Sequence, residues 1–287
     1  MYGLLIVNAF LDTEKYVTIN NMLQQAFSKY GIELVKKTNA DILADTAATW
    51  DTKPDFAIFW DKDIRLCQYL ESKGIKTFNN SKAIEICDDK GLTAIALDTI
   101  VKMPRTILAP MTFFDTYSSL AFLKEVEKTL GYPMVVKERY GSFGAQVYLA
   151  RDYSELLEIL IKTKTKPLLF QEYIVTSYGR DVRIQVVGDK VIASVMRVNE
   201  KDFIANVTHG GAMYNYTATP AQKEMALTAC RAAGLDFGGV DILFGDLDEP
   251  IFCELNSNAH FKNLLDCTGV NAAEHIAEYI KNWYESK

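Results

Sequence analysis

The feature that most constrains the fold is a pair of apolar, β-branched runs separated by only two residues. The runs DVRIQVV and KVIASVMR flank Gly188 and Asp189, which tolerate the positive φ angles of a two-residue β-hairpin turn. A second hairpin is predicted further along the chain, where GGVDILF and IFCELN enclose the turn-rich segment GDLDEP. The C-terminal region is therefore expected to be built on antiparallel hairpins.

The second hairpin brings three oxygen-bearing side chains together. Asp241 and Glu254 are equidistant from a turn at residues 247–248, so they should lie opposite each other. Asn256 then shares a face with Glu254. Two carboxylates placed in this way repel unless a cation lies between them, and an oxygen-only ligand set favours magnesium. The alternative is that the two acids are solvated hairpin residues in surface ion pairs.

The N-terminal part shows the alternation of a parallel α/β domain, with helical spacing before Gly31 and before Gly74. No GxGxxG follows the first strand, where NAFLDT stands instead, so dinucleotide binding is not expected. Residues 1–88 are predicted to form a small, Rossmann-like domain. Its strands are predicted at residues 4–7, 32–35, 56–60 and 75–78.

Composition narrows the class of protein. The net charge of −6 argues against a nucleic-acid partner, which needs clustered lysine and arginine. Five cysteines form no CxxC pair, which favours a reducing cytoplasm over a disulfide framework or a zinc site. The apolar N-terminus is too short for a signal peptide, and no run of about 18 apolar residues occurs, so no membrane partner is expected.

A lysine followed by a glycine-rich loop suits a phosphate. The segment VVKERYGSFGA places Lys137 at the end of a β-branched strand, before a loop that carries Gly141, Ser142 and Gly144. Backbone N–H groups of such a loop can approach an anion closely, and the ammonium neutralises its charge. A plain hairpin turn with an exposed lysine is the alternative. A protein kinase is not indicated, because its glycine loop precedes the lysine and an HRD segment is absent.

The segment LLFQEYI, residues 168–174, is an apolar strand that runs into polar residues between two predicted domains. Such a junction can present main-chain groups to an adenine and a carboxylate to a ribose. It can equally be a structural linker.

In order, these motifs resemble the ATP-grasp superfamily, and in particular its RimK-like branch of carboxylate–amine ligases. The resemblance implies an α/β ATP-grasp fold with an N-terminal Rossmann-like domain at 1–88, a central lid subdomain at 89–173 and a C-terminal subdomain at 174–287. The motifs are DK at 89–90, VVK at 135–137, GSFG at 141–144, QEYI at 171–174, GRDVR at 179–183, DF and GG around Asn206, VDIL at 240–243 and ELN at 254–256.

The resemblance also implies an ATP site between the middle and C-terminal regions, with Mg²⁺ or Mn²⁺ beside the phosphates. It assigns Lys90 and Lys137 to the phosphates, residues 172–174 to the adenine and Asp181 to the ribose. The implied nucleotide-binding residues are Lys90, Lys137, Gly141, Ser142, Gly144, Gln171, Glu172, Tyr173, Ile174, Asp181 and Asn206. The implied metal ligands are Asp241, Glu254 and Asn256.

The implied reaction is a ligation. ATP phosphorylates a small-molecule carboxylate, and the amine of an amino acid or small peptide attacks the acyl phosphate to give an amide and ADP. Arg183 and Arg197, on the facing strands of the first hairpin, are candidates to hold the acyl phosphate, because guanidinium groups match its oxygens. Solvent-facing strand arginines are the alternative.

Two other functions stay open. An ATP-grasp kinase would transfer the γ-phosphoryl group to a hydroxyl, but it needs a strongly basic pocket that this acidic chain does not indicate. A nucleotide-binding protein without chemistry is disfavoured because the costly residues Lys137, Asp241, Glu254 and Asn256 are intact.

The resemblance is weakest after Asn256. There the chain has SNAHFKN where many RimK-like proteins have a Pro-Gly pair, and its FKN at 261–263 is more similar to LysX-like ligases. Ile204 replaces an arginine often found in the family. His260 is either a substrate contact or a satisfied structural histidine. The sequence does not identify the substrates, the number of additions or the oligomeric state. The last helix, around Ile276, is expected to pack in the core or in a dimer interface.

Overall fold

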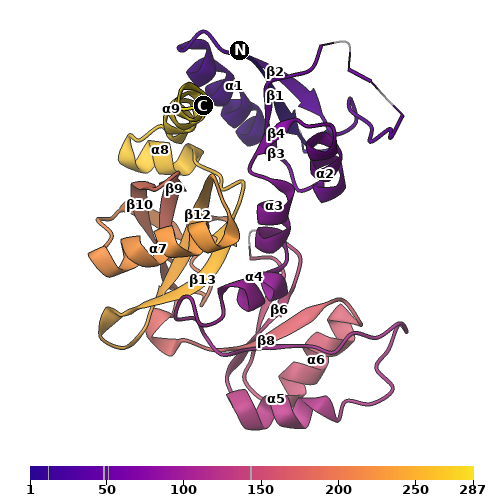
Figure 1. Cartoon of the computed structure of the whole chain (residues 1–287). Helices are drawn as coiled ribbons and strands as arrows, with labels where there is room; N and C mark the ends of the chain where they lie inside the picture. The colour runs from indigo at the N-terminus through magenta and orange to yellow at the C-terminus, as the bar shows by residue number, and fades with distance from the viewer. Residues whose placement is uncertain (12, 48, 51, 143) are drawn as a thin grey trace.

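The computed structural model describes residues 1–11, 13–47, 49–50, 52–142 and 144–287. In these residues the strands form three sheets, one in each part of the chain, which confirms the predicted α/β class. The N-terminal and middle sheets lie at opposite ends of the molecule, with the C-terminal sheet between them (Figure 1).

The N-terminal sheet is parallel throughout, with the strand order β2-β1-β3-β4. Both of its faces are covered, which explains the unbroken apolar run of its central strands. In β1, Leu5 and Val7 pack toward α1 and α9, whereas Leu4 and Ile6 pack toward α2. The elements of this part are β1 (Tyr2–Val7), α1 (Glu14–Ser28), β2 (Glu33–Thr38), β3 (Phe56–Trp60), α2 (Ile64–Ser72), β4 (Lys76–Phe78), α3 (Ser81–Asp88) and the C-terminal α9 (Ala272–Glu285).

The middle sheet has the order β5-β8-β6-β7 and is covered on one face by α5 and α6. Alternation along β6 directs Met134 and Val136 into that core, so Val135 and Lys137 face the other way, toward the C-terminal sheet. The elements are β5 (Thr106–Leu108), α5 (Phe122–Leu130), β6 (Met134–Glu138), β7 (Val147–Ala150), α6 (Tyr153–Thr163) and β8 (Leu168–Glu172).

The C-terminal sheet is antiparallel, with the order β11-β10-β9-β12-β13. Both predicted hairpins are confirmed, and Gly188 adopts the positive φ of +56° that its turn requires. The elements are α4 (Lys90–Leu97), β9 (Arg180–Val187), β10 (Lys190–Val198), β11 (Ala212–Asn215), α7 (Pro220–Ala233), β12 (Phe237–Phe244), β13 (Pro250–Asn256), α8 (Lys262–Thr268) and short 3-10 helices at Val175–Ser177, Val207–His209 and Asp246–Asp248.

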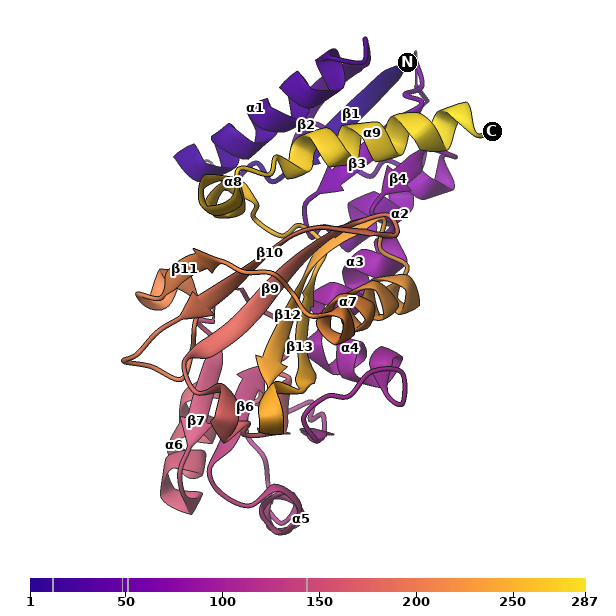
Figure 2. The ribbon, with the colours of Figure 1, turned by 90° about the vertical axis from the view of Figure 1, so that its left-hand side faces the viewer.

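Packing crosses the predicted domain boundaries in two places. Helix α4, within 89–173, packs with α3 and α7 in the core behind the C-terminal sheet. Helix α9, within 174–287, lies beside α1 on the N-terminal sheet, as the side view shows (Figure 2). The last helix is thus a core element of this chain. The domain boundaries at residues 88 and 173 stay predictions. None of the described helices combines the length and the apolar character that a membrane crossing requires.

Candidate active site

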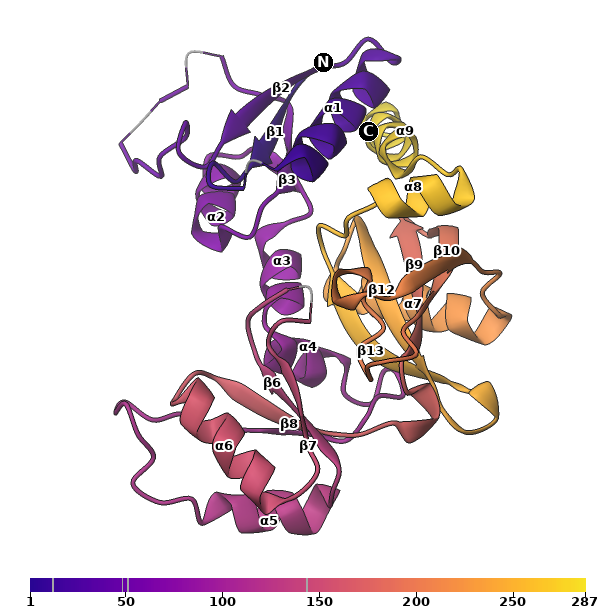
Figure 3. The same ribbon diagram turned by 180° about the vertical axis from the view of Figure 1, so that it is seen from behind.

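Two adjoining cavities lie on the C-terminal sheet. The first, which we name the lid cleft, has a volume of about 110 Å³ and separates the middle sheet from β9, β12 and β13. The second, which we name the large cavity, has a volume of about 420 Å³ and lies between the C-terminal sheet and the N-terminal domain. Viewed from behind, the N-terminal and middle sheets flank the C-terminal sheet from its two sides (Figure 3). Both cavities are lined by Ser142, Arg197, Asn206 and Glu254.

The structure brings together every site residue that the sequence predicts. Arg183 and Asn256 line the large cavity. The others line the lid cleft, and they are Lys90, Lys137, Gly141, Ser142, Gly144, Gln171, Glu172, Tyr173, Ile174, Asp181, Arg197, Asn206, Asp241 and Glu254.

The start of α4 fixes Lys90. Asp89 caps the helix by accepting hydrogen bonds from the backbone of Gly91 and Leu92, and it also accepts from the Arg139 guanidinium. Burial opposes ionisation of Asp89, but its hydrogen bonds, first from Arg139 and then from the helix backbone, hold the pKa of that carboxyl below its ordinary value. The Lys90 Nζ donates to the carbonyl of Gly141 at 3.1 Å. A lysine at the base of the cleft is therefore anchored to the glycine loop.

The glycine loop approaches the C-terminal domain closely at Gly144. This residue has a φ of +81°, and an added Cβ would lie 3.0 Å from the Nδ2 of Asn206. Both facts favour glycine there. Residue 143 of the GSFG segment lies outside the described residues.

The end of β8 forms the other wall of the lid cleft. Gln171 donates to the Thr106 hydroxyl at 2.9 Å, and the Glu172 carboxylate accepts from the backbone of Arg105 at 3.1 Å. The ring of Tyr173 meets Phe203 edge-on, with 6.2 Å between centroids. Aromatic and main-chain groups thus converge where the resemblance implies an adenine.

Four charged side chains form a buried chain at the floor. Arg197 donates to both carboxylate oxygens of Asp181 at 2.6 Å and lies 2.9 Å from Asp241. Arg183 donates to both oxygens of Asp241 at 2.7 Å. The two arginines are therefore not solvent-facing strand residues. Because Arg197 already holds both oxygens of Asp181, a ribose hydroxyl would have to share them.

Asp241 and Glu254 are paired across β12 and β13, as the hairpin count predicts. Burial disfavours the charged form of Asp241, but Arg183 and Arg197 outweigh it and hold the pKa of this carboxyl well below its ordinary value. Glu254 lies 3.5 Å from the Nζ of Lys90. Asp241 is 3% exposed and is therefore not a solvated surface residue, whereas the Glu254 side chain is 29% exposed.

The donor chemistry of the predicted ligands fits a hard divalent cation. Asp241, Glu254 and Asn256 supply two carboxylates and one amide, a set that leaves room for phosphate oxygens. The Nδ2 of Asn256 is buried and has no hydrogen-bond partner within the described chain. The described residues contain no group of three or more His, Cys, Asp or Glu able to hold a metal ion, so a cation here would depend on the amide and on ligand oxygens. Arg183 must release an oxygen of Asp241 for a cation to bind there.

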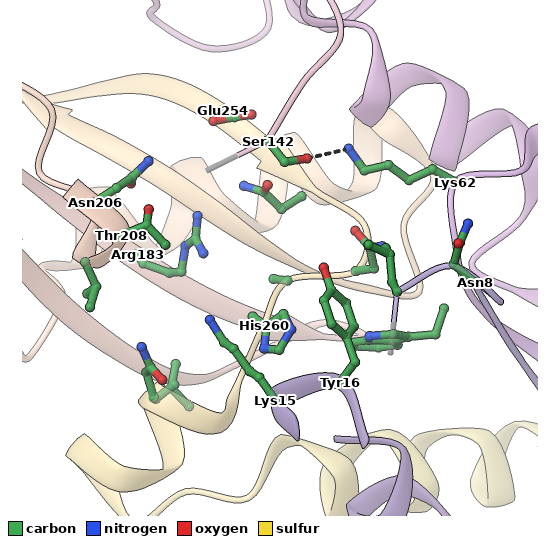
Figure 4. A pocket seen from close by; sticks show the side chains of 18 of the residues that line it. Asn8, Lys15, Tyr16, Lys62, Ser142, Arg183, Asn206, Thr208, Glu254 and His260 are labelled. Atoms are coloured by element: carbon green, nitrogen blue, oxygen red, sulfur yellow. Dashed lines mark hydrogen bonds between the residues drawn. The ribbon is translucent and has the colours of Figure 1, made fainter. Parts of the chain in front are cut away.

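The N-terminal domain supplies nine of the 24 residues that line the large cavity, and the sequence predictions missed them. These residues follow the ends of β1 and β3 or lie at the start of α1 (Figure 4). Polar residues directly after the apolar strands, in NAFLDT and in DKD, were the available signal, because ligands bind at the carboxyl ends of parallel strands. The missed polar and aromatic residues of this domain are Asn8, Lys15, Tyr16, Asn20, Trp60, Asp61 and Lys62.

Buried polar groups without partners are concentrated on this cavity. Asn20 Oδ1 and Trp60 Nε1 are unpaired within the described residues, as are both ring nitrogens of His260. Burial, then Lys15 and Arg183, lower the pKa of His260 to about 4. Its ring meets Tyr16 edge-on at 4.7 Å. His260 is therefore not a satisfied structural histidine.

A smaller sheet that closes over an antiparallel sheet, with lysines between them, defines the ATP-grasp class. Comparison with solved structures confirms this fold. A RimK domain ATP-grasp protein from Sphaerobacter thermophilus DSM 20745 superposes with a TM-score of 0.75, at 19% identity, over 97% of this chain and 99% of that chain.

Residues 88–280 match the model of the RimK-like ATP-grasp domain, and the chain belongs to that family. It is 30% identical over 278 residues to the uncharacterized protein MG012 of Mycoplasma genitalium, covering 95% of this chain and 96% of that one. It is 32% identical over 223 residues to N-acetylaspartylglutamate synthase A of Homo sapiens, covering 76% of this chain and 56% of the synthase. The predicted class, an ATP-dependent ligase that joins a carboxylate to an amine, is confirmed by the family and by relatives named as a synthase and as a probable alpha-L-glutamate ligase.

Proposed function

We propose that this chain activates a small-molecule carboxylate as an acyl phosphate and joins it to the amine of an amino acid or small peptide. The observation that supports this most directly is that the lid cleft and the large cavity meet at Ser142, Arg197, Asn206 and Glu254. A nucleotide in the first and a carboxylate in the second would touch only there. ATP and two further substrates can thus share one reaction centre.

The proposed chemistry follows from the charges at this meeting point. Lys90 and Lys137 would bind the phosphates, and a carboxylate oxygen attacks the γ-phosphorus as ADP leaves. Arg183 and Arg197 would hold the acyl phosphate while the deprotonated amine attacks its carbon and phosphate departs. A divalent cation, Mg²⁺ with Mn²⁺ as the alternative, would be held by Asp241, Glu254 and Asn256 and would neutralise phosphate charge.

We further propose that the substrates are acidic. Lys15, Lys62 and Arg183 line the large cavity and give it a positive wall, which favours carboxylate-bearing molecules. The name of the human relative indicates a product of this kind.

The cysteines fit a reducing cytoplasm, because all of them are free thiols: Cys67, Cys87, Cys230, Cys253 and Cys267. No nucleic-acid partner is proposed, and a homo-oligomer stays open.

The test is a matrix of carboxylates and amines, read by ADP release and by mass spectrometry of the product. We expect ADP to form only when both substrates are present, with an amide as the product. No turnover across acidic amino acids, N-acyl amino acids and dipeptides would contradict the proposal. A stable phosphorylated product with one substrate would identify a kinase instead.

A further inference from the structure

One lysine of the N-terminal domain reaches the point where the two cavities meet. Lys62 follows β3 and lies outside the segment that matches the family model. Its backbone is fixed on both sides: the buried Asp61 accepts a hydrogen bond from the Lys62 N–H at 2.7 Å, and Asp63 caps α2. The side chain therefore leaves a pinned turn at the carboxyl end of a parallel strand, where substrate contacts are expected.

The Lys62 ammonium joins two elements of the nucleotide site. It donates to Asp88 at 2.6 Å, directly before the residues that cap α4 and carry Lys90. It also donates to the hydroxyl of Ser142 in the glycine loop at 3.2 Å (Figure 4). Ser142 and Lys62 both line the large cavity. Two of the three ammonium N–H groups are engaged in these contacts, which leaves one for a ligand oxygen.

We propose that Lys62 is a positioning residue that links the carboxylate substrate in the large cavity to Ser142 of the glycine loop, so that nucleotide and carboxylate bind cooperatively. This inference rests on the proposed function. A carboxylate that accepts the third N–H would hold the ammonium against Ser142, and the loop in turn contacts Lys90 through Gly141. Cooperativity requires that each ligand bind more tightly when the other is present, which this chain of contacts would provide.

The ion pair of Lys62 with Asp88 should contribute little to the stability of the fold. The Lys62 side chain is 36% exposed and that of Asp88 is 17% exposed, and partly exposed ion pairs contribute little to stability. Lys62→Met keeps the alkyl stem and removes the charge. We therefore expect its melting temperature to stay close to that of the wild type, which makes the functional comparison clean.

The experiment measures binding and does not depend on turnover. The affinity for N-acetylaspartate, as the probe carboxylate, is measured by calorimetry with and without AMPPNP and Mg²⁺. In the wild type we expect about tenfold tighter binding when the nucleotide is present. The ratio of the carboxylate affinity with the nucleotide to that without it should fall to about one in Lys62→Met and in Ser142→Ala. The double variant should have the same ratio as either single variant.

Lys76→Met is the matched control. Lys76 lies in the same domain, has a side chain 32% exposed and pairs with Asp236 at 3.7 Å, but it lines neither cavity. It should keep the full ratio. The inference is overturned if Lys62→Met retains the ratio, or if Lys62→Met and Ser142→Ala act additively. Failure of the proposed function would appear in the wild type itself, as an absence of binding and of turnover for every carboxylate.

Where the wild type turns over, kinetics add a second readout. Lys62→Met should raise the KM for the carboxylate about tenfold and increase the share of ATP hydrolysed without product. Because the coupling is reciprocal, the affinity for AMPPNP should be unchanged without the carboxylate and should fall about tenfold in its presence. A change in the KM for ATP alone would count against the assigned role.

Discussion

The lid cleft and the large cavity differ in how their polar groups are satisfied. Asp181, Arg197 and Asp241 line the lid cleft, and with Arg183 of the large cavity they neutralise one another through short hydrogen bonds. These charges are held in place before any ligand binds, and a cation at Asp241 would require Arg183 to release one of its oxygens. The nucleotide is the ligand that we propose for the lid cleft.

In the large cavity, by contrast, several buried polar atoms have no hydrogen-bond partner in the described part of the chain. Asn20, Trp60 and His260 are buried there with unpaired polar atoms, according to the described part of the chain. An unpaired buried polar group costs about 1–3 kcal/mol, which a ligand with complementary hydrogen bonds would recover. These atoms are closed to water, so side chains at the wall must shift on binding. The comparison indicates that the shared chemistry lies in the lid cleft and that substrate selection lies in the large cavity.

The largest predicted effect tests the junction between the two cavities. Glu254→Gln keeps the shape of the side chain and removes the charge that faces Lys90. We expect kcat to fall roughly a thousandfold, because charge neutralisation at the phosphoryl group would be lost. Glu254 is a better target than Asp241, whose loss would remove the carboxylate that pairs with Arg183, at a cost of about 3–5 kcal/mol.

The control for this variant lies on the same hairpin. Glu249→Gln alters an exposed acid that pairs with Lys102, so activity should be unchanged. Thermal unfolding checks that both variants fold. Full activity in Glu254→Gln would show that the metal assignment is wrong.

The next prediction tests the unpaired state of the large cavity directly. Asn20→Leu replaces a buried amide, 6% exposed, by an apolar side chain of similar size. We expect the free energy of unfolding to rise by about 1 kcal/mol, because an unpaired acceptor is removed. The KM for one substrate should rise about tenfold, since the ligand loses a hydrogen bond, while the KM for ATP stays constant.

Asn79 provides the matched control, because it is a fully buried asparagine whose amide is satisfied. Its Nδ2 donates to the carbonyls of Phe237 and Ser257, and its Oδ1 accepts from the backbone of Asp236 and Phe237. Asn79→Leu should lower the free energy of unfolding by more than about 3 kcal/mol. If Asn20→Leu destabilises the chain in the same way, the distinction between paired and unpaired groups fails.

The two cavities also differ in how far the sequence predicted them. Most of the predicted site residues line the lid cleft, because they lie in short motifs that resemble a known family and because counting from a hairpin turn aligns Asp241 with Glu254. Lys62 was missed for the opposite reason. Its position depends on the order of parallel strands and on contacts with Asp88 and Ser142, which are 26 and 80 residues away along the chain.

Helix packing was similarly outside the reach of local patterns. The apolar face of α9 was visible in the sequence, but nothing local indicated that it covers the N-terminal sheet beside α1. The same holds for α4, which packs behind the C-terminal sheet although it follows the N-terminal domain directly. Hydrophobic spacing predicts that a face is buried and leaves its partner undetermined.

The smallest predicted effect concerns the charge state of His260, which Lys15, Arg183 and the ring of Tyr16 surround. Its pKa of about 4 lies below the ordinary value of 6.5, so between these two values the unfolded chain binds more protons than the folded one. The stabilisation is thus fully present above pH 6.5 and is lost as the pH falls toward 4. Urea unfolding should show this slope, and His260→Gln should reduce it.

By NMR, the imidazole of His260 should not titrate between pH 5.5 and 8. An anionic substrate bound against the ring would raise this pKa, because an opposite charge favours imidazolium, whereas a neutral group would leave it low. The titration with bound substrate therefore decides which part of the ligand the large cavity holds at His260, and a normal pKa in the free chain would refute the buried, unpaired state.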